Sequence, residues 1–220
     1  MKRTLAGAAL FAAVFQAHAG ITALGGPTTL ITAPASMKYT ANAYNTATVN
    51  YWVERENHLL ANDLVISMLP PVSFPTNVTS HFNNNDNKIV AGTAIDSYYL
   101  YFDPSSGDAV ARFQTDRTIL GLITNERNNA ANDHFMLSDY LINPLVPSGN
   151  IPASHFEARG MEIGANEYVR WLAPNQIEVH LSATNPGDQI RIITAAVPEP
   201  ATLAALGLGA LSLLRRRRTG

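Results

Sequence analysis

The chain has 220 residues, contains no cysteine and carries a formal net charge of −2 at pH 7. The lack of cysteine excludes disulfides, thiol catalysis and cysteine-ligated zinc or iron–sulfur centres. The charge is unevenly distributed, because six of the basic residues lie near the two ends, and residues 20–197 hold nine Lys and Arg against sixteen Asp and Glu, a net charge of −7. Such an acidic region argues against nucleic-acid binding, which needs a basic surface.

The first 19 residues are organised as a secretory signal peptide. Lys2 and Arg3 form a positive n-region, residues 5–15 are apolar, and Ala17-x-Ala19 is a small-x-small cleavage site. We therefore expect cleavage directly after this triplet. A retained N-terminal membrane anchor is the alternative.

Residues 20–196 show short β-type segments separated by turns rich in Asn, Gly and Pro, with no repeat and no long helical period. About 178 residues suffice for one domain that buries roughly 70% of its unfolded surface. Residues 20–45 are expected to be an edge strand or a loose leader. For residues 46–196 we expect an all-β fold, a single antiparallel β-sandwich of the jelly-roll type, flanked by the signal helix and a C-terminal transmembrane-type helix.

Individual elements are expected from alternation and turn residues. Residues 98–102 and 109–113 are expected to pair as a hairpin around the turn at 103–108, where Pro and Gly interrupt the strands. One helical turn is expected at 54–60 and a short helix at 137–141. Further strands are expected at 46–53, 118–124, 160–163, 167–172, 176–181 and 188–194.

Carboxylates in the 103–108 turn are candidate ligands for Ca²⁺. Asp103 and Asp108 lie across the sequence DPSSGD, with Asp96 shortly before it, and an exported domain could use such oxygen ligands. The spacing is not that of an EF-hand, and Asp-Pro and Gly-Asp are common turn sequences. The Asn-rich cluster at 83–86 has the same two interpretations. We expect no cofactor unless Ca²⁺ binds there.

The spacing of residues along the sequence indicates no catalytic site. A glycosidase needs two carboxylates roughly 5–9.5 Å apart in a cleft, and the sequence cannot place together any two of Glu157, Glu162, Glu167 and Glu178. Neither H-E-x-x-H nor G-x-S-x-G occurs, which gives no support for a His-ligated zinc site or a serine nucleophile. We therefore assign no catalytic residue and expect no enzyme.

Aromatic residues offer one binding hypothesis. Trp52 and Trp171, together with the tyrosines at 98, 99 and 101, are candidates for a platform on which sugar rings stack. The alternative is that these strand aromatics divide between core and surface.

The last 24 residues have three parts in a strict order. A tripeptide, Pro198-Glu199-Pro200, interrupts regular structure because proline fixes φ and lacks a backbone donor. An apolar run at 201–214 follows, shorter than the roughly 20 residues of a full membrane span, and snorkelling arginine stems can extend it. The cluster that ends the run should stay cytoplasmic under the positive-inside rule; it comprises Arg215, Arg216, Arg217 and Arg218.

This tail resembles the PEP-CTERM sorting signal of Gram-negative bacteria. The resemblance implies recognition by exosortase, a membrane-embedded cysteine-protease-like transpeptidase, transient retention at the inner membrane by the C-terminal helix, and processing near the Pro-Glu-Pro motif. The region before the tail resembles uncharacterised β-rich domains that often precede such signals, through GTAIDSYYLYFDP, ILGLIT, LSDYL, RGMEIGANEYVRW and GDQIRIIT. That second resemblance implies no activity.

Together these features predict an exported cell-surface or extracellular-matrix protein with a structural or adhesive role and no enzymatic activity. A carbohydrate-binding module for exopolysaccharide is the first alternative, and a secreted hydrolase is the second. The expected partners are the exosortase-type transpeptidase, the inner membrane and, for the first alternative, exopolysaccharide.

Overall fold

The structure of the chain is a computed structural model that describes residues 20–37, 46–78, 87–124, 133–142, 144–151, 160–161, 166–183 and 187–196. Residues Ala19–Val197 form one compact unit, which contains all of these ranges. The expected signal segment at 1–19, with its cleavage site at Ala17 and Ala19, lies outside the described residues, as does the tail at 197–220.

The first five-stranded sheet, which we call sheet I, is antiparallel throughout and has the strand order β1-β8-β11-β10-β5. Its central strands alternate in burial, so that Ala109 and Ala111 of β8 face the core while Val110 and Arg112 face outward. This alternation is typical of a sheet with one solvated face. The strands are β1 (Ile21–Gly25), β8 (Gly107–Thr115), β11 (Gln176–Ala183), β10 (Tyr168–Ala173) and β5 (Thr76–Val78).

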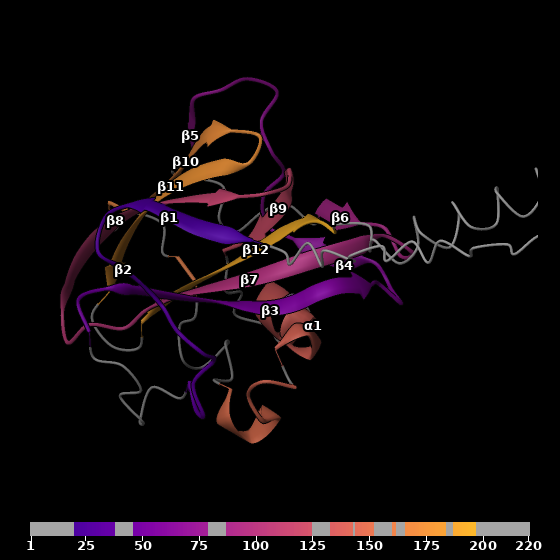
Figure 1. The fold of residues 1–220 in the computed structure, drawn as a ribbon, viewed down its shortest axis with the longest axis horizontal. Coiled ribbons are helices and arrows are strands. Elements are labelled where there is room, and N and C mark those ends of the chain that lie inside the picture. Colours follow the sequence, from indigo (N-terminus) through magenta and orange to yellow (C-terminus); the bar gives the residue numbers. More distant parts are fainter. Residues whose placement is uncertain are drawn as a thin grey trace, which may run out of the picture. The chain divides into compact units, whose positions relative to one another are not determined.

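The second five-stranded sheet, sheet II, has the order β2-β3-β7-β12-β9 and is antiparallel except for the parallel pair β2–β3 (Figure 1). Two of its inner strands, β7 and β12, are buried at almost every position, including polar residues such as Ser97 and Arg191. A separate two-stranded sheet pairs β4 (Leu64–Ile66) with β6 (Asn87–Ile89). The strands of sheet II are β2 (Thr28–Leu30), β3 (Val49–Leu59), β7 (Ala94–Phe102), β12 (Asp188–Ala195) and β9 (Ile119–Ile123).

Two hydrophobic clusters explain how the layers pack. The larger cluster draws buried residues from both five-stranded sheets, and within it the rings of Tyr51 and Phe113 meet edge to face at 5.3 Å. The smaller cluster lies on the other face of sheet II, where the ring of Tyr99 stacks on Trp52 at 5.0 Å and lies 6.2 Å from that of Phe135. The cover on this face includes β4, β6 and the short helices α1 (His134–Ser138) and η3 (Asp139–Leu141). Sheet II is therefore packed on both faces.

The described residues are mostly β, with antiparallel sheets, as the sequence predicts, but the expected hairpin around 103–108 is wrong. Strand β7 pairs with β3 and β12 in sheet II, whereas β8 pairs with β1 and β11 in sheet I. The link between them crosses from one sheet to the other, and its Asp103 and Pro104 are buried. A turn sequence specifies a change of direction but not which strand becomes the neighbour. Both edges of β7 are occupied by β3 and β12, so β8 pairs in the other sheet.

The expected helical turn at 54–60 is also wrong. Strand β3 continues through this polar segment to Leu59, with register shifts between Val53 and Arg55 and between Arg55 and His58. Asn57 adopts a left-handed φ of 49°, and its amide donates to Asp96 Oδ1 at 2.7 Å. Irregular strand geometry of this kind lets polar residues leave the core without ending the strand.

Other expectations differ only in their bounds. Strands β9, β10, β11 and β12 lie where the sequence predicts strands, and β10 and β11 form a true hairpin through Pro174 and Asn175. The helix expected at 137–141 begins earlier, at His134, because Asp133 caps it by accepting from the Met136 amide at 3.0 Å. Of the strand expected at 160–163, Gly160 and Met161 are described and are not in a strand.

Among the described residues, no helix has the length and apolar character needed to cross a membrane. The apolar run expected to do so, 201–214, lies outside these residues.

Candidate functional site

The solvent-facing side of sheet I carries a row of charged residues on three adjacent strands. Arg112 of β8 is the register partner of Glu178 of β11, and Glu178 is the partner of Arg170 of β10. Facing partners on adjacent antiparallel strands are close enough for their side chains to interact. We call Arg112, Glu178 and Arg170 the charged row.

Glu178 is the centre of this row and is held by three side chains. The Arg112 Nε donates to its Oε2 at 2.5 Å, the Tyr168 hydroxyl donates to its Oε1 at 3.1 Å, and Arg170 Nη1 lies 3.9 Å from Oε1. Burial alone would raise the pKa of Glu178, but the hydrogen bonds from Arg112 and Tyr168 and the two positive charges outweigh it and hold the pKa below its usual value. Glu178 therefore remains an anion at neutral pH.

Tyr168 is a fixed donor beside the row. Burial and its hydrogen bond to the Glu178 carboxylate raise the pKa of Tyr168 above its ordinary value of 10. Its ring lies 5.4 Å from that of His180, whose Nδ1 is 2.7 Å from the Asn166 carbonyl oxygen. The hydroxyl thus stays protonated across the physiological pH range.

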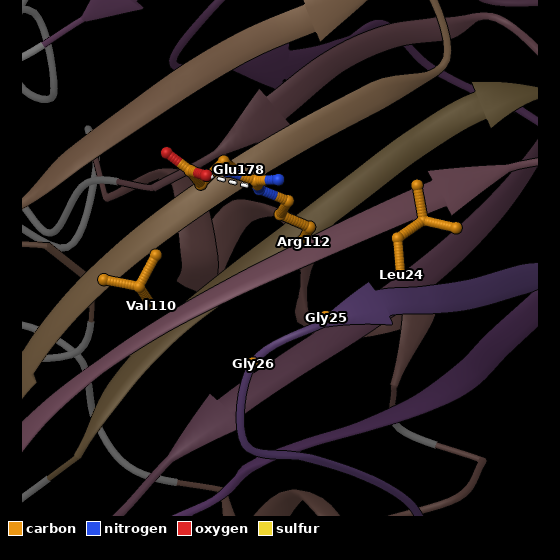
Figure 2. Close-up of a pocket in the computed structure, with 6 residues that line it drawn as sticks. All are labelled: Leu24, Gly25, Gly26, Val110, Arg112 and Glu178. Carbon is orange, nitrogen blue, oxygen red and sulfur yellow. Dashed lines mark hydrogen bonds and ion pairs between the residues drawn. The ribbon is translucent and has the colours of Figure 1, made fainter.

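A cavity of about 250 Å³ adjoins the row (Figure 2). Two glycines at the end of β1 create this space. A Cβ on Gly26 would lie 2.1 Å from the Val110 carbonyl oxygen, so this residue runs close against β8, whereas a Cβ on Gly25 would meet nothing within 4 Å. The cavity is lined by Leu24, Gly25, Gly26, Val110, Arg112 and Glu178.

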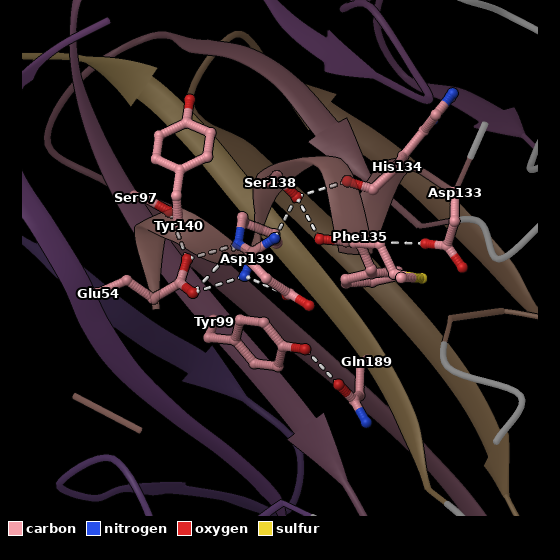
Figure 3. Close-up of polar contacts among 12 residues, drawn as sticks. Glu54, Ser97, Tyr99, Asp133, His134, Phe135, Ser138, Asp139, Tyr140 and Gln189 are labelled. Carbon is pink, nitrogen blue, oxygen red and sulfur yellow. Dashed lines mark hydrogen bonds and ion pairs between the residues drawn. The ribbon is translucent and has the colours of Figure 1, made fainter. Parts of the chain in front are cut away.

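A second polar cluster is buried between sheet II and α1 (Figure 3). The Nε of Arg191 on β12 donates to both carboxylate oxygens of Glu54 on β3, at 3.1 and 2.8 Å, and Nη2 donates to Oε1 at 2.9 Å. Nη1 donates to the Ser138 hydroxyl, and Asp139 Oδ1 lies 3.5 Å from Nη2. This cluster connects two strands of sheet II to the helical cover.

The surroundings of Arg191 are aromatic as well as ionic. Its guanidinium carbon lies 5.0 Å from the Tyr99 ring centre and 5.8 Å from that of Phe135. Burial would lower the pKa of Arg191, but the Glu54 charge and hydrogen bonds raise it above the ordinary value, so the side chain stays charged. With both partners fully buried, we interpret this cluster as structural.

Ser67 and His134 form a pair that resembles a nucleophile with its base, but it is inaccessible. The Ser67 Oγ lies 3.0 Å from His134 Nδ1 and accepts a hydrogen bond from the Thr124 amide at 3.1 Å. Both residues are buried, and we assign the pair no catalytic role.

The comparisons with known proteins concern the C-terminus. Residues 196–218 match the family described as the PEP-CTERM protein-sorting motif. The chain carries a PEP-CTERM sorting tail. This PEP-CTERM match confirms the resemblance seen in the sequence, and it implies processing by an exosortase and export across the membrane to the cell surface. No curated protein and no solved structure matches the chain.

The residues of the PEP-CTERM tail lie outside the described residues, so the structure adds no geometry to them. They are the sorting motif Pro198, Glu199 and Pro200 and the cluster Arg215, Arg216, Arg217 and Arg218.

The sugar-stacking platform predicted at Trp52 and Trp171 is wrong. Trp52 is 2% exposed and packs on the outer face of sheet II, and Trp171 is 0% exposed and lies in the core shared by the two sheets. The tyrosines at 98, 99 and 101 are equally buried. A strand of half-apolar sequence can direct its aromatics to either face, and here all of them help to form the two cores.

The candidate Ca²⁺ ligands fall in different surroundings. Asp103 is buried in the link between the sheets, whereas Asp108 is exposed at the start of β8. Among the described residues, no group of three or more His, Asp or Glu side chains is placed to hold a metal ion. The second candidate cluster, 83–86, lies outside the described residues.

Two of the four candidate glycosidase carboxylates can be located. Glu167 Oε1 accepts the Ser182 amide at 3.0 Å, and Glu178 lies in the charged row. Glu157 and Glu162 lie outside the described residues. The charged row was not predicted from sequence, because its residues are distant in the chain. The outward alternation in 109–113 and 176–181 is the sequence pattern that could have indicated it.

Proposed function

We propose that this PEP-CTERM protein is a non-enzymatic structural or adhesive component of the cell surface or extracellular matrix. The observation that carries the proposal is the sorting motif at 196–218, since it assigns the chain to exosortase processing. The apolar run at 201–214 and the arginines after it hold the chain briefly at the inner membrane, with the basic end on the cytoplasmic side.

We further infer that the exported region is a single β-sandwich of the jelly-roll type. The shared hydrophobic cluster between sheets I and II supports this, as does the link from β7 to β8 that passes between the sheets. Without cysteine, the stability of this domain outside the cytoplasm depends on its packed core and on buried polar clusters such as that of Arg191.

The burial and hydrogen bonding of the candidate catalytic groups support the absence of enzymatic activity. The Ser67–His134 pair is buried, and the Glu167 and Glu178 carboxylates are engaged in hydrogen bonds to the fold. A secreted hydrolase would require an accessible pair of carboxylates in one cleft.

Carbohydrate binding is a second candidate function, supported by the cavity beside Arg112 on the solvent face of sheet I. A matrix component that also binds polysaccharide would be retained where the polymer accumulates. This function uses the charged row instead of the tryptophans.

The deciding experiment for the sorting role is the intact mass of the protein from envelope and medium, in cells with and without the exosortase. We expect a wild-type product that begins at Gly20 and lacks the residues beyond the Pro-Glu-Pro region, while cells without exosortase keep the tail. A tail retained in both strains would contradict sorting and leave a membrane-anchored domain.

Two substitutions within the motif test whether the change in mass depends on it. Pro198→Ala combined with Pro200→Ala should block maturation, because the extended segment that the transpeptidase recognises is lost. A product of normal mature size from this variant would contradict the role of the motif.

A further inference from the structure

We propose that the cavity beside the charged row binds an acidic polysaccharide, with Arg112 contacting a sugar carboxylate. This inference rests on the carbohydrate-binding alternative given above and names its ligand class and site.

The charge of the row is opposite in sign to that of the region around it. Residues 20–197 carry a net charge of −7, yet the row holds two guanidinium groups and a single carboxylate, a local charge of +1. Strand β8 carries one acidic residue on this face, Asp108. It is four positions from Arg112, or about 14 Å along an extended strand. That distance exceeds the screening length of about 8 Å in physiological salt. The row is thus a basic site on an acidic unit.

Glu178 orients Arg112 through a hydrogen bond to its Nε. The Glu178 carboxylate is engaged by Arg112 Nε, by Tyr168 and by the nearby charge of Arg170, and its side chain is only 5% exposed. The Arg112 side chain is 55% exposed, and among the described residues only its Nε has a protein hydrogen-bond partner. Its two Nη groups can therefore donate to a carboxylate in the paired geometry that guanidinium groups favour.

The cavity has a size and lining that fit one sugar unit. At about 250 Å³, it lies just below the range of roughly 300–1,000 Å³ typical of pockets for drug-sized ligands, which suits one sugar unit of a longer chain. Leu24 and Val110 are exposed aliphatic residues on its wall, able to contact the apolar face of a sugar ring. Because the site lies on a solvent face next to the edge strand β1, a polymer can continue past it in both directions.

The test measures binding of fluorescein-labelled oligogalacturonate to the full chain in mild detergent by fluorescence anisotropy. Polygalacturonate, its methyl ester and dextran serve as competitors, because the first two share a backbone and differ in charge, whereas dextran is neutral. The tail arginines also attract polyanions, so each variant keeps the same tail and is compared with a control that changes the same chemistry elsewhere.

Two variants address the site independently. Arg112→Gln removes the contact with the carboxylate and should weaken binding by about tenfold or more, in keeping with a charge-assisted hydrogen-bond pair. Gly25→Val fills the open space without changing charge and should weaken binding by a similar factor. Their controls are Arg117→Gln, an exposed arginine outside the row, and Gly149→Val, where an added Cβ also meets nothing within 4 Å. Both controls should remain within about twofold of the parent, a difference too small to involve a lost hydrogen bond.

Any of the following outcomes would contradict the proposal. Equal losses in Arg112→Gln and Arg117→Gln would mean non-specific attraction, and unchanged binding in Gly25→Val would exclude the cavity. Competition by the methyl ester or dextran as strong as that by polygalacturonate would support a neutral-sugar module and reject an acidic ligand. Failure of all three polymers to compete, with normal tail processing in the mass experiment, would reject carbohydrate binding and leave the sorting proposal intact.

Discussion

Arg191 and Glu54 form a fully buried ion pair across sheet II, although their strands, β12 and β3, are separated by β7. The two residues are 137 positions apart in the chain, so the pair closes a long loop. Ser97, on the intervening strand, donates to Glu54 Oε2 at 2.5 Å and completes the contact across all three strands. The pair therefore requires correct pairing of all three strands.

We predict that Arg191→Met destabilises the domain by about 3–5 kcal/mol, because Glu54 is left as an uncompensated buried charge. The double variant Glu54→Leu with Arg191→Met should regain most of this loss, since an apolar pair of similar volume avoids the desolvation cost. Urea unfolding of the two variants and the parent measures both values. A loss below about 1 kcal/mol for the single variant, the range of exposed ion pairs, would mean that Glu54 is not buried as described.

The lowered pKa of Glu178 predicts how the stability of the domain changes at acidic pH. Its folded-state pKa is held below the ordinary value of 4.5, so its contribution is fully present above that value and is lost as the pH falls through the folded pKa. Glu178→Gln should therefore reduce the loss of stability below about pH 4.5 and change the pH dependence little at neutral pH.

The matched control is Asp108→Asn, which removes an exposed carboxylate on β8 from the same face of sheet I. Urea midpoints are measured at half-unit pH steps from 3 to 7 for the parent and both variants, and at pH 7 the control should remain within about 0.5 kcal/mol of the parent, as for other surface substitutions. If the urea midpoints of Glu178→Gln follow those of the parent at every pH, the row does not perturb the pKa of Glu178.

The adjacent glycines at the end of β1 should respond in opposite ways to alanine. Gly26 has a φ of 89°, and its added Cβ would collide with the β8 backbone, so Gly26→Ala should cost roughly 1–3 kcal/mol through strain and displacement of β1. Gly25→Ala should leave stability unchanged within about 0.5 kcal/mol, as for other surface substitutions. Thermal unfolding of the two variants checks this, and equal effects would contradict the close approach of Gly26 to β8.

The arginine cluster of the tail should set membrane orientation. Replacing all four arginines at 215–218 with alanine should allow the C-terminus to leak into the periplasm, because no positive charge then holds it on the cytoplasmic side. A C-terminal reporter that is active only in the periplasm measures this change, with Arg117→Ala as a control in the exported region. Unchanged retention of the substituted tail would contradict transient anchoring by this segment.

Much of this protein could be predicted from sequence because the relevant signals are local. The order of Pro-Glu-Pro, apolar run and arginines identifies the sorting tail without any knowledge of the fold, since prolines, hydrophobicity and charge act on neighbouring residues. Alternation predicted β11, and short β-type runs bounded by turn residues predicted β9, β10 and β12 for the same reason, because both patterns are properties of neighbouring residues.

Only the tertiary structure decided which strands are neighbours and what lies between them. The sequence DPSSGD is compatible with a hairpin and with a link between sheets, and the choice depends on β3 and β12, which lie far from it in the chain and flank β7. The same long-range pairing buries Trp52 and Trp171 and aligns Arg112, Glu178 and Arg170 in one row. Burial and charge clustering depend on contacts between distant segments, so the tail could be identified from sequence alone, whereas the binding face required the fold.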